Sequence, residues 1–167
     1  MNEIIRRLED AILKSTNDSL LYSIFEGKLD LIKKHFKTSL SIFDALFNNK
    51  EIEIDKDRFY KDTLLILDII KSFLIFSPIN QKQSAFLRDY LEALLNINRG
   101  YIKDKGLERD ILLAIRLLDL FITSSELAMV LKEWRLYLNQ LLSVKPPAYK
   151  LAEHYLKVLE EDLSDQK

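Results

Sequence analysis

The sequence contains no cysteine among its 167 residues. A disulfide framework, a thiolate-ligated metal site and a cysteine nucleophile are therefore excluded. Glycine and proline are scarce, with three residues of each, so the chain has few of the turn residues that a many-stranded sheet requires. Leucine and isoleucine are abundant whereas valine and threonine are few, a balance that favours helices over strands. The composition predicts an all-α protein.

The sequence also lacks long apolar runs and an excess of charge of one sign. Asp68 and Lys71 interrupt the longest apolar run, which stays short of the roughly 18 residues that a membrane span requires. The first residues, MNEIIRRLEDAILK, are amphipathic and have no signal-peptide core. We therefore expect a cytoplasmic protein with no membrane partner. Because the net charge is −1, any attraction to nucleic acid must come from a local patch.

Apolar residues recur at helical spacing over most of the chain. The stripes predict helices over residues 4–13, 21–36, 39–48, 57–76, 81–98, 107–122, 123–144 and 151–159. Pro78 stops one of these helices, and Gly27 is a weak point within another. The charged segment 49–57 is expected to be a loop, because no second strand candidate lies nearby. We expect one domain over residues 1–167, a compact bundle of seven to eight helices.

Two parts of the chain resemble each other at a separation of 48 residues. Residues 45–73 align without a gap on residues 93–121, and eight of these 29 positions are identical. One interpretation is a duplicated helix–loop–helix unit, packed pseudo-symmetrically. The other is that two amphipathic helices of similar length and Leu-rich composition resemble each other. The repeated Asp62 and Asp110 have an ordinary explanation, since carboxylates in the first turns of a helix favour its dipole.

Motifs for catalysis, cofactors and metals are missing. The two histidines, His35 and His154, form no pair at the spacing that places two metal ligands on one helix face. The acidic run of segment 51–57 lacks the glycine and the final glutamate of a calcium-binding EF-hand loop. No nucleophile elbow, Walker loop or dinucleotide-binding glycine motif occurs. We expect a protein that is not an enzyme and binds neither a metal nor a cofactor.

A glycine-flanked basic segment, NRGYIKDKGLER, is the first candidate surface. Its cations and its one aromatic residue are Arg99, Tyr101, Lys103, Lys105 and Arg109. Cations on a mobile loop beside a stackable ring are suited to backbone phosphates of single-stranded nucleic acid. The alternative is a solvated loop, because Asp104 and Glu108 dilute the charge.

The second candidate surface lies in the stretch LKEWRLYLNQ. Trp134 and Tyr137 share one helix face, and Arg135 is adjacent. Tryptophan, tyrosine and arginine are enriched at binding hot spots, so these residues are candidates for contact with a partner protein. Because Leu131 and Leu138 share roughly the same face, the default interpretation is that Trp134 anchors the core.

Elimination leaves two functional hypotheses. The first is a non-catalytic helical adaptor or assembly subunit that contacts a partner protein, or a second copy of itself, through an exposed apolar groove. The second is a small accessory subunit of a nucleic-acid-processing complex, of the replication or CRISPR-effector type, that contacts phosphates through the basic segment.

Two short stretches resemble a known family. DRFYKD and ITSSELAMVLKEW are similar to helix starts in the helical domain of archaeal GINS replication subunits. The β-domain that such subunits carry has no counterpart in this sequence, which puts a GINS-like role in doubt. Small helical subunits of CRISPR effector complexes are similar to the chain in size and composition only.

Overall fold

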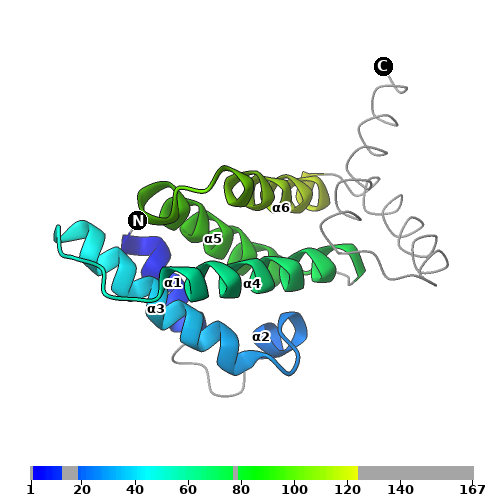
Figure 1. The fold of residues 1–167 in the computed structure, drawn as a ribbon. Coiled ribbons are helices and arrows are strands. Elements are labelled where there is room, and N and C mark those ends of the chain that lie inside the picture. The colour runs from blue at the N-terminus through cyan, green and yellow to red at the C-terminus, as the bar shows by residue number, and fades with distance from the viewer. Residues whose placement is uncertain (1, 13–18, 77–78, 124–167) are drawn as a thin grey trace.

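The computed structural model describes residues 2–12, 19–76 and 79–123 (Figure 1). These residues form six α-helices and one π-helical turn, and no strand is among them. The elements are α1 (Asn2–Ile12), α2 (Ser19–Ile24), α3 (Leu29–Phe47), α4 (Lys56–Phe76), α5 (Gln81–Ile97), η1 (Asn98–Ile102) and α6 (Lys105–Thr123). The prediction of an all-α fold is therefore confirmed.

The four long helices pack around a shared centre. Helix α3 contacts α4, α4 contacts α6, α6 contacts α5, and α5 returns to contact α3. Helix α1 packs against α3 and α5, and the short α2 contacts α4 and α5 (Figure 1). The end of α3, the beginning of α1 and the end of α5 lie at the same end of the bundle (Figure 1). This end contains the groove described below.

Leucine, isoleucine and phenylalanine fill the centre. Buried side chains come from every helix, among them Leu8 on α1, Leu21 on α2, Phe36 on α3, Leu67 on α4, Leu91 on α5 and Ile111 on α6. A smaller second cluster of Ile42, Phe59 and Ile97 lies where α3, α4 and α5 meet the π-turn. The expected loop at 49–57 is confirmed apart from its last two residues, which begin α4.

The predicted boundary between helices 21–36 and 39–48 is wrong. The chain breaks instead at Gly27, whose φ of +72° lies in the left-handed region that favours glycine, and α3 continues from Leu29 to Phe47. The hydroxyls of Thr38, Ser39 and Ser41 donate to backbone carbonyls four residues earlier. These bonds satisfy the hydroxyls inside the helix, so the polar residues do not end it.

The predicted loop between α5 and α6 is also wrong over most of its length. Residues Asn98–Ile102 form a π-helical turn, and only Lys103 and Asp104 separate it from α6. The Asn98 side chain holds both backbone groups of Asp104, accepting from its N–H at 3.1 Å and donating to its carbonyl at 2.9 Å. Asp104 in turn caps α6 by accepting from the Leu107 N–H. The connection is therefore internally bonded rather than loose.

The helices predicted over residues 123–144 and 151–159 extend beyond the described ranges. The predicted total of seven to eight helices therefore also depends on residues outside these ranges. Within the described ranges, no helix combines the length and apolar character needed to cross a membrane.

Candidate functional site

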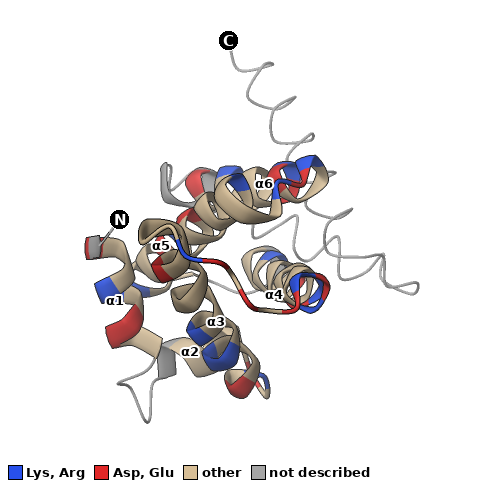
Figure 2. Ribbon diagram, turned by 60° about the vertical axis from the view of Figure 1, so that its left-hand side comes forward, with Lys and Arg blue, Asp and Glu red and all other residues tan. Residues whose placement is uncertain are grey.

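The residues predicted to contact nucleic acid follow one another along the junction of α5 and α6. Arg99 and Tyr101 lie in η1, Lys103 follows it, and Lys105 and Arg109 lie in the first two turns of α6. Figure 2 shows basic and acidic residues intermixed along α1, α4 and α6. The described helices thus present charges of both signs.

Two of these five residues already have partners within the chain. Arg99 donates from Nε to Glu108 Oε1 at 2.7 Å. Tyr101 is half-buried against the small cluster of Ile42, Phe59 and Ile97, and Lys56 Nζ lies 5.1 Å from the centre of its ring. A base could stack on that ring face only by displacing Lys56.

The remaining three cations, Lys103, Lys105 and Arg109, are exposed. Lys103 has a φ of +56°, and its N–H donates to the Asn98 carbonyl at 2.6 Å. The structure therefore offers three accessible cations, on a junction held by internal hydrogen bonds rather than on an open loop. The second predicted surface, Trp134, Arg135 and Tyr137, lies outside the described residues.

The acidic side chains of segment 51–57 are exposed, as expected of a solvated loop: Glu51, Glu53, Asp55 and Asp57. Asp55 accepts from the Arg58 N–H at the start of α4, which is a capping role. Within residues 2–12, 19–76 and 79–123, no cluster of three or more histidine or carboxylate side chains could hold a metal ion.

His35 is buried where α3, α4 and α5 meet. Its Nδ1 lies 2.6 Å from the Tyr90 hydroxyl and its Nε2 lies 2.8 Å from Thr63 Oγ1. The ring stacks on Phe59 with centroids 4.6 Å apart. The spacing of the two histidines indicated no function for His35, but the structure places it at 3% exposure inside a polar network.

The direction of each hydrogen bond in this network follows from Thr63. Its hydroxyl donates to the Phe59 carbonyl at 2.7 Å, so Thr63 Oγ1 must accept from His35 Nε2–H. His35 Nδ1 then carries no proton and accepts from the Tyr90 hydroxyl. Burial lowers the pKa of His35 to about 3 and raises the pKa of Tyr90 well above its ordinary value. At neutral pH, His35 is uncharged and each hydroxyl or N–H of the network has an acceptor.

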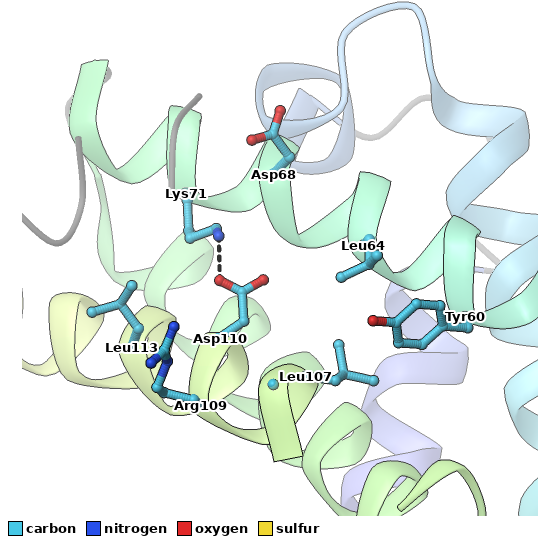
Figure 3. Close-up of a pocket in the computed structure, with 9 residues that line it drawn as sticks. Tyr60, Leu64, Asp68, Lys71, Leu107, Arg109, Asp110 and Leu113 are labelled. Carbon is cyan, nitrogen blue, oxygen red and sulfur yellow. Dashed lines mark hydrogen bonds and ion pairs between the residues drawn. The ribbon is translucent and has the colours of Figure 1, made fainter. Parts of the chain in front are cut away.

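A second buried polar contact joins α4 to α6. Lys71, which is 2% exposed, forms an ion pair with Asp110, whose side chain is 16% exposed. Beside the pair is a cavity of about 330 Å³ whose apolar walls include Leu64, Leu107 and Leu113. Figure 3 shows the Tyr60 hydroxyl pointing into the space between the helices, whereas Asp68 points away from the ion pair.

The charges of this cavity balance. Lys71 and Arg109 are matched by Asp68 and Asp110, and the innermost cation is held by a carboxylate. A buried ion pair of this kind is strongly destabilised when one partner is removed. The described contacts therefore give Lys71 and Asp110 a role in joining two helices, with no excess charge for an ionic ligand.

An apolar groove lies at the end of the bundle formed by α1, α3 and α5. Its volume is about 470 Å³. The residues that line it are Ile5, Leu40, Phe43, Asp44, Leu46, Phe47 and Asn96. Phe47, the last residue of α3, is 83% exposed and Leu46 is 39% exposed. Phe47 has the largest exposed fraction among the exposed large apolar side chains of the described residues.

The wall and the rim of the groove are fixed by short contacts. A Cβ added at Gly100 would lie 3.2 Å from Leu46 Cδ1, so the absence of a side chain there lets Leu46 approach η1 closely. At the rim, Asp44 accepts from Asn48 Nδ2 at 2.8 Å and lies 3.8 Å from Lys50 Nζ. Asn96 donates to the Glu92 carbonyl at 3.0 Å.

Sequence patterns could have identified His35 and Lys71 as buried. His35 lies three residues after Ile32 and next to Phe36, on the apolar stripe of α3, and Lys71 lies four residues after Leu67 on that of α4. A second stripe on α3, at Leu40, Phe43 and Phe47, runs beside the buried one. That additional stripe was the available signal for the groove.

No protein family, curated protein or solved structure matches this chain.

Proposed function

We propose that the protein is a non-catalytic α-helical adaptor or assembly subunit that acts through protein–protein contacts. The observation that carries this proposal is the apolar groove between α1, α3 and α5, with the exposed Phe47 at its edge. Contiguous exposed apolar surface on a folded domain marks interaction sites. Grooves between helices commonly accept the apolar face of a partner helix.

The energetics of Phe47 favour an interaction role. Burying a phenylalanine side chain stabilises a structure by about 1.5–3 kcal/mol, a gain that Phe47 does not obtain at 83% exposure. A partner that covers the groove would bury Phe47 and Leu46 together. Phenylalanine is also among the residues enriched at interfaces relative to the remaining surface.

The polar interior supports a role without catalysis. Both ring nitrogens of His35 are engaged by Tyr90 and Thr63, and Lys71 is held by Asp110. General acid–base catalysis requires a group that can reach a substrate proton. The groups of each contact are instead bonded to one another within the fold.

Site-specific photo-crosslinking tests the proposal. A photoreactive phenylalanine analogue at Phe47 is expected to form adducts with a protein partner in cells, identified by mass spectrometry. The same analogue at Tyr22, which is 55% exposed on α2, provides a matched aromatic control and is expected to form none. Absence of any protein adduct at position 47 would refute a contact role for the groove.

The exposed cations Lys103, Lys105 and Arg109 support a second candidate, a small accessory subunit of a nucleic-acid-processing complex that contacts backbone phosphates. Fluorescence anisotropy with single-stranded DNA, single-stranded RNA and duplex, at low and physiological salt, tests it. This function predicts binding that weakens with salt and is lost on reversing Lys103 and Lys105 to glutamate. Reversal of the exposed Lys37 and Lys61 is the charge-matched control. No binding at low salt would eliminate this candidate.

We also propose that residues 45–73 and 93–121 derive from one duplicated unit. Several corresponding positions are buried in both segments, among them Ala45/Ala93, Phe59/Leu107, Ile66/Ala114 and Ile70/Leu118. Related sequences test this origin. It requires the two halves to resemble each other more strongly in other members of the family, whereas loss of the resemblance would favour independent amphipathic helices.

A further inference from the structure

The surface at the end of α3 contains both a protruding aromatic ring and an apolar hollow. Phe47 projects at 83% exposure from the edge of a groove of about 470 Å³. We propose that a second copy of this chain occupies the groove, so that each copy inserts Phe47 into the groove of the other. This inference rests on the proposed function, since it names the partner of the same groove.

The shape of the surface fits a two-fold arrangement. In a symmetric dimer the same patch serves both subunits, so each copy must supply the projection and its receptor. Phe47 is the projection, and Ile5, Leu40 and Phe43 line the receptor. A volume of about 470 Å³ falls in the range of pockets that accept ligands larger than one aromatic ring.

The charges at the rim are self-complementary. Asp44 and Lys50 are both exposed and lie 3.8 Å apart across the end of α3. An exposed pair at this distance contributes little to stability within one copy, so Lys50 can turn to Asp44 of the other copy at small cost while each Asp44 keeps its bond to Asn48. A rim of one sign would repel an identical surface.

The polar groups in the groove already have hydrogen bonds. Asn96 Nδ2 donates to the Glu92 carbonyl, and Asp44 Oδ1 accepts from Asn48. Covering the groove with an apolar ring therefore leaves these two contacts intact. The close approach of Leu46 to Gly100 fixes one wall of the groove. The entropy lost when side chains are ordered on docking is therefore smaller.

The patch is small, which sets the expected strength of the dimer. Stable complexes bury about 800 Å² on each partner, more than one groove and one ring are expected to supply. We therefore expect a reversible dimer whose population depends on concentration. Sedimentation equilibrium of the full chain is expected to show a mass rising from 19.7 kDa toward twice that value with concentration.

Two variants, each with an exposed aromatic residue replaced by aspartate, identify the surface through which the copies dimerise. Phe47→Asp is expected to weaken dimerisation by about tenfold or more, as for removal of a central hot-spot residue. Tyr22→Asp replaces an exposed aromatic residue on α2 and is expected to leave the dimer unchanged. Thermal unfolding of both variants verifies that they fold. A dimer that resists Phe47→Asp, or is lost with Tyr22→Asp, would overturn the assignment of the face.

Because the chain contains no cysteine, a single introduced cysteine can be labelled specifically in each copy. Ser41→Cys carrying a spin label, at an exposed position of α3 outside the groove lining, is expected to give a distance between copies whose population rises with concentration. This signal is expected to vanish with Phe47→Asp. A chain that stays monomeric at every concentration would overturn self-docking. The adaptor function would then be tested separately, by crosslinked adducts between position 47 and other proteins. A failure of self-docking is therefore distinguishable from a failure of the adaptor function.

Discussion

The centre of the bundle and the end of α3 differ in how polar and apolar groups are placed. At the centre, the polar side chains of His35, Thr63 and Tyr90 are buried and bonded to one another. At the end of α3, Phe47 and Leu46 are exposed beside an apolar groove. Polar side chains therefore contribute to the cohesion of the interior, whereas apolar side chains remain accessible at the end of α3. Four changes test this division.

The largest effect is expected at the ion pair between α4 and α6. Asp110→Ala removes the carboxylate that faces the buried Lys71 and is expected to lower the free energy of unfolding by about 3–5 kcal/mol. Adding Lys71→Met is expected to restore most of this loss, because an apolar side chain needs no counter-charge. Chemical denaturation measures both. As a control on the same helix, Glu108→Ala breaks the exposed pair with Arg99 and is expected to cost at most about 1 kcal/mol.

Tyr90→Phe sharpens the comparison by removing one donor without changing the ring. His35 Nδ1 loses its hydrogen bond inside the core, and an unsatisfied buried group costs about 1–3 kcal/mol. Tyr22→Phe, at an exposed position, is expected to have no measurable effect. Equal stability of the two variants would show that the Tyr90 hydroxyl does not hold His35.

Acid is expected to destabilise the fold through His35. Because burial lowers its folded-state pKa from 6.5 to about 3, only the unfolded chain gains the proton as the pH falls below about 6.5. The free energy of unfolding is therefore expected to fall by about 2 kcal/mol between pH 7 and pH 5, and the loss continues toward pH 3. Asp89 acts in the opposite sense, because burial raises its pKa.

Denaturation of His35→Gln and of the parent chain over the same pH range identifies the source of this slope. The slope is expected to be smaller in the variant than in the parent chain. An unchanged slope in His35→Gln would assign the pH dependence to other groups.

The smallest effect on stability is expected at the groove. Phe47→Asp replaces a side chain that is 83% exposed, and surface changes of this kind usually shift stability by less than about 0.5 kcal/mol. The melting temperature is therefore expected to stay near that of the parent chain while contacts at the groove are lost. A large drop in melting temperature would show that Phe47 belongs to the fold rather than to an interface.

Helical spacing predicted most of the long elements. The apolar stripes and the polar breaks between them placed α4, α5 and α6 to within a few residues of their observed ends. Gly27 was identified as a weak point, although the helix was predicted to continue through it. The continuity of α3 through Thr38, Ser39 and Ser41 was missed, because hydroxyl-to-backbone bonds depend on rotamers that a pattern does not show.

The candidate sites were less predictable than the helices. The basic segment was visible as a pattern, but the pairing of Arg99 with Glu108 and of Tyr101 with Lys56 requires the folded π-turn. The second apolar stripe of α3 was a signal for the groove, but it does not show that Ile5 of α1 and Asn96 of α5 complete the lining. His35 and Lys71 could have been placed in the core by spacing, but their partners could not.

The hydrogen bonds run in one direction, from Tyr90 to His35 and from His35 to Thr63. This chain of bonds disfavours alternative packings of the helices. Leucine-rich helices can slide past one another by a turn and still bury apolar surface. A slide of α3 by one turn, about 5.4 Å, would separate His35 from both of its partners at once. The observed register of α3, α4 and α5 therefore gives His35, Thr63 and Tyr90 their hydrogen-bond partners, whereas a shifted α3 would bury His35 without its partners. We therefore expect the trio to favour the observed alignment of α3, α4 and α5 over shifted ones, in addition to its contribution to stability.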